Sequence, residues 1–187
     1  MKKIYYWCGL ICSLLLSGSV SASNTEYNVA KGLAPASNQS IQTLKPFEGQ
    51  FRILGYKFYH DDEQAKFSPV DLAVSSGLFA DPQIASQISV QQYDRYLKWS
   101  IPYLPVPAKQ AIEMVFNIHF VPASPEIAQQ IKQIKRGDLV HLQGELIEIN
   151  DKNLVWKSSL SRDDVGDGAC EVFRVNEIQW LEKQREI

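Results

Sequence analysis

Apolar and polar positions alternate along much of the chain beyond residue 46, which predicts a domain made mainly of strands. The clearest alternation runs over Met114–Val121, where Asn117 and His119 share the polar side of the expected strand. The other expected strands are Phe51–Tyr59, Tyr93–Ile101, Leu139–Ile149, Leu154–Leu160 and Ala169–Val175.

Three segments begin with a pattern that predicts the start of a helix, a serine or aspartate followed by proline. Ser124 precedes Pro125, an apolar stripe at helical spacing follows, and Gly137 ends the segment. Similar but shorter patterns predict a helix from Ser68 to Gly77 and another after Asp81. A last short helix is expected over Asn176–Lys183.

The strand Leu139–Ile149 contains Gly144, which indicates a bulge or bend, and a turn at residues 150–153 returns the chain as a hairpin. A bent strand can serve two sheets at once, as in small barrels. We therefore expect an α+β fold, with a small OB-like β-barrel of five or six strands and a few short helices. A mixed antiparallel sheet with helices on one face is the alternative.

The first residues are typical of a bacterial signal peptide. Two lysines precede a mostly apolar run over Ile4–Leu16, and Val20-Ser21-Ala22 fits a small-x-small cleavage site. The sequence thus predicts a signal peptide over 1–22, a flexible tether over 23–45 and a single globular domain over 46–187. We expect a periplasmic or secreted protein. The alternative is an uncleaved leader that acts as an N-terminal anchor in the inner membrane and so gives membrane association.

Composition narrows the function classes. The 187 residues are 45 % hydrophobic and 21 % charged, with a formal net charge of −2, as in ordinary soluble domains. The absence of a basic excess weighs against a nucleic-acid partner. Two of the three cysteines lie in the expected leader, which leaves Cys170 alone and rules out a disulfide scaffold or a cysteine-rich zinc site. No cofactor is expected.

Candidate catalytic residues are few. His119 with Asn117 could supply a base and an oxyanion donor, and Cys170 or Ser159 could be the nucleophile. The simpler interpretations are a half-exposed polar pair linked to a neighbouring strand, and a cysteine buried as an inert core residue. Neither G-x-S-x-G nor S-x-x-K occurs in the chain.

The loop before Cys170 is rich in acidic residues and glycine. Asp163, Asp164 and Asp167 could form a three-carboxylate calcium site. However, the EF-hand template fails at Val165 and Arg174, and a turn with local Asp hydrogen bonds is the favoured interpretation.

Two motifs indicate a family resemblance. They are Ser68–Ala73 (SPVDLA) and Trp156–Glu171 (W-x-S-S-L-x-R-x-D-x-G-x-G-A-C-E), with Asn117–Ala123 between them. The chain resembles, over about residues 47–175, a family of exported or membrane-associated bacterial proteins that has no established activity. The matched positions that the resemblance nominates for testing are Asp71, Asn117, His119, Ser159, Arg162, Asp164, Cys170 and Glu171.

No complete catalytic constellation is visible, so we expect a non-enzymatic binding or accessory module for an envelope protein or glycan partner. The alternative is an envelope hydrolase or transferase that uses His119 with Cys170 or Ser159. Aromatic residues could stack on sugar rings, although core packing is their commoner role. The candidate binding residues are Asp71, Arg162, Asp164, Glu171, Trp156 and Trp99.

Overall fold

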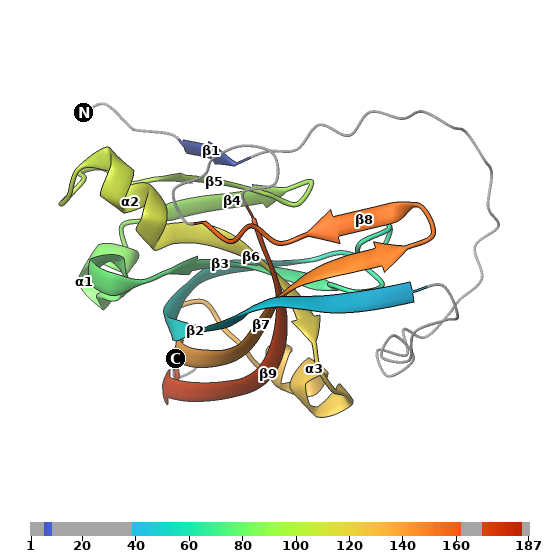
Figure 1. Ribbon diagram of the computed structural model, residues 1–187. Coiled ribbons are helices and arrows are strands. Elements are labelled where there is room, and N and C mark those ends of the chain that lie inside the picture. The colour runs from blue at the N-terminus through green and yellow to red at the C-terminus, as the bar shows by residue number, and fades with distance from the viewer. Residues whose placement is uncertain (1–5, 9–38, 162–169, 185–187) are drawn as a thin grey trace.

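The computed structural model describes residues 6–8, 39–161 and 170–184 (Figure 1). Strands dominate, and the α-helices are short, which confirms the α+β class. The strands are β1 (Tyr6–Cys8), β2 (Gln39–Phe58), β3 (Val70–Ser75), β4 (Ser89–Tyr93), β5 (Tyr96–Ser100), β6 (Val115–Pro122), β7 (Leu139–Asp151), β8 (Leu154–Lys157) and β9 (Glu171–Glu182). The helices are the 3-10 helix η2 (Gly77–Ala80) and α1 (Pro82–Ala85), α2 (Ala108–Met114) and α3 (Pro125–Ile131).

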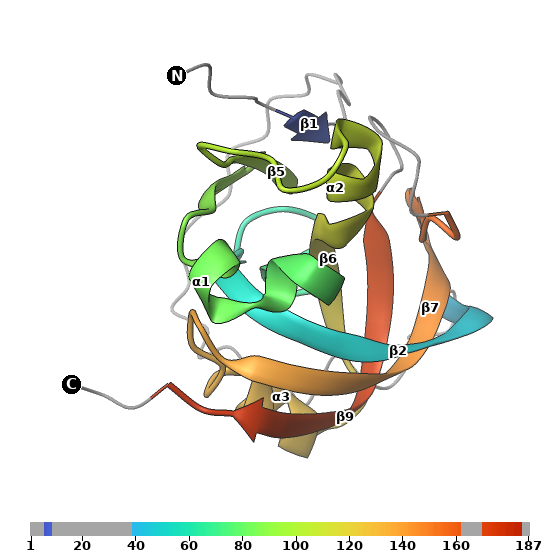
Figure 2. The same cartoon turned by 90° about the vertical axis from the view of Figure 1, so that its left-hand side faces the viewer.

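The main sheet has six strands in the order β2-β3-β6-β9-β7-β8. Strand β2 also pairs with β7, so that β2, β3, β6, β9 and β7 form a closed ring of hydrogen bonds (Figure 2). The pair β6–β9 is parallel, whereas β2–β3, β3–β6 and β7–β9 are antiparallel. The mixed sheet given as the alternative is therefore present.

Two long strands bend to close the ring. Strand β2 pairs with β7 over Gln39–Arg52 and with β3 over Arg52–Phe58. Strand β7 shifts register at Gly144, as predicted, and a Cβ atom at this glycine would collide with the carbonyl oxygen of Arg174 on β9. The expected tether is wrong for residues 39–45, because pairing with β7 holds this polar stretch in β2.

A second sheet, in the order β1-β5-β4, lies over one side of the ring (Figure 1). Its β4–β5 hairpin turns at Asp94 and Arg95, which have φ angles of 46° and 68°. The strand predicted over Tyr93–Ile101 is therefore present only from Tyr96 to Ser100, as β5, and the prediction is wrong for the turn at Asp94 and Arg95. Strand β1, which falls within the expected leader, pairs with β5.

Three groups of buried side chains form the core. The largest lines the inside of the ring and includes Val70, Leu72, Ile118, Phe120 and Phe173. A second group joins the ring to the β4–β5 hairpin and includes Leu54, Ala73, Phe79, Leu97 and Trp99. A third lies under β8 and includes Phe67, Val121, Ile147, Trp156 and Val172. The ring therefore has buried side chains on both of its faces.

Two of the predicted helices are present and two are wrong. Helix α3 begins as predicted, with the Ser124 hydroxyl accepting a hydrogen bond from the Ile127 amide at 3.3 Å, and α1 begins after Asp81. The helix predicted from Ser68 is wrong, because every residue of β3 is buried between β2 and β6. The helix predicted over Asn176–Lys183 is also wrong, because β9 continues along β7 to Glu182. In the described ranges, none of the helices has the length and hydropathy to cross a membrane.

Candidate functional site

A buried carboxylate, Asp71 on β3, is the centre of the most extensive polar network in the described part of the chain. Its side chain is 0 % exposed. One oxygen, Oδ1, accepts hydrogen bonds from Arg95 at 2.9 Å and from His119 Nδ1 at 2.8 Å. The other, Oδ2, accepts a hydrogen bond from the Asn117 amide at 3.3 Å. These donors satisfy a charge that would otherwise be very costly to bury.

Arg95 enters this network from the tip of the β4–β5 hairpin. Its guanidinium also donates two hydrogen bonds to Asp62, at 2.7 and 2.8 Å, and one to the Ser68 carbonyl at 2.9 Å. The group lies 3.8 Å from the centre of the Tyr59 ring, whose hydroxyl accepts the Arg95 backbone N–H at 3.1 Å. The left-handed backbone at Arg95 is unfavourable for a residue with a Cβ atom, and these contacts hold it in place.

Electrostatics follow from burial and from these partners. Burial alone would lower the pKa of Arg95, but the hydrogen bonds and charges of Asp62 and Asp71 outweigh it and raise this pKa. Burial, followed by the negative charge of Asp71, raises the pKa of the Tyr59 phenol. Arg95 therefore stays charged and Tyr59 stays neutral across the physiological pH range.

The remaining polar contacts bind the hairpin to the ring. Gln92 on β4 donates hydrogen bonds to the Asn117 side chain at 2.9 Å and to the Asp71 carbonyl at 3.2 Å. Trp156 on β8 covers His119, with ring centres 4.9 Å apart. The name Asp71 cluster is used below for Tyr59, Asp62, Asp71, Gln92, Arg95, Asn117 and His119.

The pairing of Asp71 with His119 resembles the base and orienting acid of a hydrolase. Because an ionised carboxylate can only accept, Nδ1 of His119 is the donor. However, both His119 and Asn117 are 3 % exposed, so the half-exposed pair expected from the sequence is in fact buried, although its link to the neighbouring strand is present. This burial keeps substrate away from the imidazole in the conformation described.

The described residues show no hydrogen bond between this base and either proposed nucleophile. Ser159 Oγ donates to the Ser161 carbonyl and accepts from the Ser161 amide, both at 3.0 Å. Cys170 is partly exposed just before β9, whereas the sequence predicted a buried core residue. Its pattern suggested a strand from residue 169, but β9 begins at Glu171. Within the described residues, the hydrogen bonds of His119 reach neither side chain.

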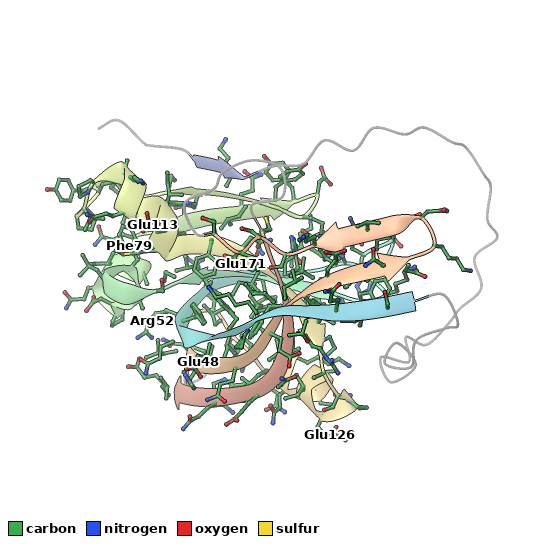
Figure 3. All side chains as sticks on the ribbon, viewed as in Figure 1. Glu48, Arg52, Phe79, Glu113, Glu126 and Glu171 are labelled. Atoms are coloured by element: carbon green, nitrogen blue, oxygen red, sulfur yellow. The ribbon has the colours of Figure 1, made fainter. Side chains whose placement is uncertain are left out.

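The predicted binding residues are mostly inside the protein. Trp99 is 3 % exposed in the second core group, and Trp156 and Asp71 are buried. Glu171, labelled in Figure 3, is also buried, at the start of β9. These four residues are buried in the conformation described, so a partner could contact them only after the fold opens. Arg162, Asp163, Asp164 and Asp167 lie outside the described residues, and among those described no cluster of His, Cys, Asp or Glu is suited to a metal.

An aromatic surface that the sequence did not nominate lies at the end of β2. Tyr56 and Phe58 are 48 % and 42 % exposed, and their rings meet edge to face with centres 5.8 Å apart. Phe58 also lines a cavity of about 170 Å³ with Pro69, Val70, Pro122, Ala128 and Ile131, while His60 and Lys132 complete the lining. We call Tyr56, Phe58 and this cavity the Phe58 surface.

Sequence reasoning missed four members of the cluster: Tyr59, Asp62, Gln92 and Arg95. Arg95 was assigned to the middle of a strand, and Asp62 belongs to an acidic run that is typical of a solvated turn. Tyr56 and Phe58 did carry a signal, since aromatic residues at alternate positions share one face of a strand.

In comparisons with known proteins, the chain matches no family model, no curated protein and no solved structure.

Proposed function

We propose that this protein is an exported envelope module that binds a protein or glycan partner and has no catalytic activity of its own. The observation that supports this most is the contrast between its two sites. His119 and Asn117 are buried and hydrogen-bonded to Asp71, whereas Tyr56 and Phe58 are exposed beside a cavity. Exposed aromatic residues are typical of recognition surfaces.

We also propose that the ring is a small barrel of the OB type. Numbered within the ring, its strands follow the order 1-2-3-5-4 and return to 1, and α3 lies between the third and fourth strands. OB barrels bind ligands on the face of their second and third strands and through the adjoining loops. Here those strands are β3 and β6, whose outer residues Asp71 and Asn117 are covered by the β4–β5 hairpin. Recognition is thereby left to the end of β2 and the loop that follows it, where the Phe58 surface lies.

Site-specific photo-crosslinking in the producing cells tests the binding function. A photoreactive amino acid replaces Tyr56, and the matched control carries it at Tyr103, which is 76 % exposed and precedes α2. We expect covalent adducts from position 56 and none from position 103. Sensitivity of the adduct to protease or to glycan hydrolases identifies the partner class. Equal labelling at both positions, or none at either, would contradict the proposal.

Export is tested by the intact mass of the protein recovered from the envelope fraction. Cleavage after Ala22 gives a chain that begins at Ser23, whereas the alternative anchor retains the whole leader. An uncleaved protein in the cytosolic fraction would overturn the assignment to the envelope.

The hydrogen bond between Asp71 and His119 favours the second candidate, a hydrolase or transferase of the envelope. Such an enzyme would have to open the β4–β5 hairpin to expose His119 and bring Cys170 or Ser159 within about 2.6–3.2 Å of it. Turnover of ester or amide substrates by the purified protein, abolished by His119→Ala, would establish this function in place of the first.

A further inference from the structure

The cavity beside Phe58 has the dimensions of one side chain. Its volume of about 170 Å³ is close to the ~150 Å³ of a protein cavity that holds a single benzene. Pockets that bind whole small molecules are larger, about 300–1,000 Å³. Size therefore favours an occupant that projects one apolar group into the cavity, such as a residue of a bound polypeptide.

The lining agrees with such an occupant. Six of the eight residues around the cavity are apolar, and two of them, Pro69 and Pro122, belong to rigid backbone. A glycan would need several polar groups that converge on its hydroxyls, whereas only His60 and Lys132 have polar side chains here. A wall that is already formed also reduces the ordering cost of binding.

A positive charge beside the cavity can contribute to recognition of the same partner. Lys132 follows the last residue of α3, is exposed, and forms no ion pair with any other described residue. Its ammonium group can pair with a carboxylate that lies next to the inserted side chain. Tyr56 extends the apolar wall beyond Phe58 and can cover the flanking part of a bound segment.

We propose that the Phe58 surface binds a protein partner, by receiving one aromatic or large aliphatic side chain of an extended segment while Lys132 pairs with a neighbouring carboxylate. This inference rests on the proposed binding function and assigns its partner class. The minimal mimic of such a segment is N-acetylphenylalanine, which has one ring and one carboxylate. Its neutral counterpart is N-acetylphenylalanine amide.

The test is a titration of the ¹⁵N-labelled full chain with each compound, followed through backbone amide shifts. We expect N-acetylphenylalanine to shift Phe58 and Ile131, with a dissociation constant in the millimolar range, and the amide to bind about 1.5- to 5-fold more weakly. Lys132→Gln should remove this difference, whereas Lys109→Gln on α2, also an exposed lysine, should preserve it. Ala128→Leu fills the cavity and should abolish the binding of both compounds. Phe58→Ala, at a half-exposed position, removes one wall of the cavity without adding bulk to the interior, and it should also abolish the binding of both compounds.

Three results would overturn this inference. The first is an absence of shifts at Phe58 and Ile131 up to the solubility limit of both compounds. The second is that chitotriose or maltotriose shifts these residues, which would give the cavity to a glycan while the binding function itself stands. The third is self-association of the chain that Phe58→Ala removes, which would make a second copy the occupant. Failure of the crosslinking at position 56, by contrast, counts against the binding function as a whole.

Discussion

Replacing Arg95 with methionine tests whether the Asp71 cluster holds the two sheets together. The substitution keeps an unbranched apolar stem that can still cover Tyr59, but it removes the guanidinium, which bonds to Asp71, Asp62 and Ser68. Asp71 is left with its charge at 0 % exposure, and only the His119 and Asn117 hydrogen bonds remain to stabilise it. The Asp62 side chain is 32 % exposed and can be rehydrated.

The expected loss of stability follows from the difference in burial between Asp71 and Asp62. Removing one partner of a buried ion pair costs about 3–5 kcal/mol, and this range applies to Asp71. The exposed pair with Asp62 adds at most about 1 kcal/mol. We therefore expect Arg95→Met to lower the free energy of unfolding by roughly 3–5 kcal/mol, and the melting temperature by roughly 6–20 °C for a chain of this length.

Urea denaturation followed by tryptophan fluorescence measures this loss. Asp62→Asn should cost less than about 1 kcal/mol, and Lys109→Met on the surface should stay within about 0.5 kcal/mol. In Arg95→Met/Asp71→Asn the buried charge is removed together with its partner, so the double variant should be more stable than the sum of the single losses predicts, by about 0.5–3 kcal/mol. A loss below about 1 kcal/mol in Arg95→Met, or strict additivity in the double variant, would refute the role assigned to the cluster.

Three further predictions concern the ring, the buried phenol and α3. Gly144→Ala places a Cβ atom against the Arg174 carbonyl and should lower stability by about 1–3 kcal/mol; an unchanged urea midpoint would contradict the close approach of β7 and β9. Because the pKa of Tyr59 is raised in the folded state, its contribution to stability is complete below the unfolded pKa of about 10 and is lost as the pH rises above it. Tyr59→Phe should flatten this alkaline loss of stability. Tyrosinate absorbance just above pH 10 should show equal numbers of ionised phenols in the two native proteins, and one fewer in Tyr59→Phe after both are unfolded. The pKa of Glu126, at the outer end of α3 in Figure 3, is lowered by its hydrogen bond with Ser124. Its contribution to stability is therefore present above the unfolded pKa of about 4.3 and is lost as the pH falls through the folded value. Ser124→Ala should cost about 0.5–2 kcal/mol through the lost cap and weaken this acid dependence, as measured by urea midpoints between pH 3 and pH 7.

Much of the fold could be predicted because local chemistry and tertiary structure agree there. The Ser124 cap, the Asp81 start of α1, strand β6 and the bend at Gly144 all appear where the sequence indicates them. In each case nearby residues in the sequence carry the signal, so the element can be identified before its distant partners are known.

The errors arise where a distant partner determines the structure. Ser68-Pro69 has the chemistry of a helix start, but burial between two strands makes the following residues β3. The turn at Asp94–Arg95 contains neither glycine nor proline, and the left-handed backbone of Arg95 is held by Tyr59, Asp62 and Asp71. Residues 39–45 form a strand only because β7 supplies their hydrogen bonds.

The candidate site shows the same limit. The sequence nominated Asp71, Asn117 and His119, which the fold does bring together, but it could not show that a hairpin tip buries them. Tyr56 and Phe58 lie at the end of β2, beyond the part that pairs with β7, and their exposed position depends on the β2–β3 pairing. Burial, more than residue type, thus separates the structural residues from those available for recognition.

The most direct test of this separation is the yield of crosslinked partner from a photoreactive residue at position 56 in two backgrounds. His119→Gln alters the buried cluster, and Phe58→Ser alters the exposed surface; circular dichroism confirms that each variant is folded. We predict that the adduct persists in His119→Gln and is lost in Phe58→Ser. An adduct that survives Phe58→Ser but disappears in folded His119→Gln would show that the buried histidine, and not the aromatic surface, engages the partner.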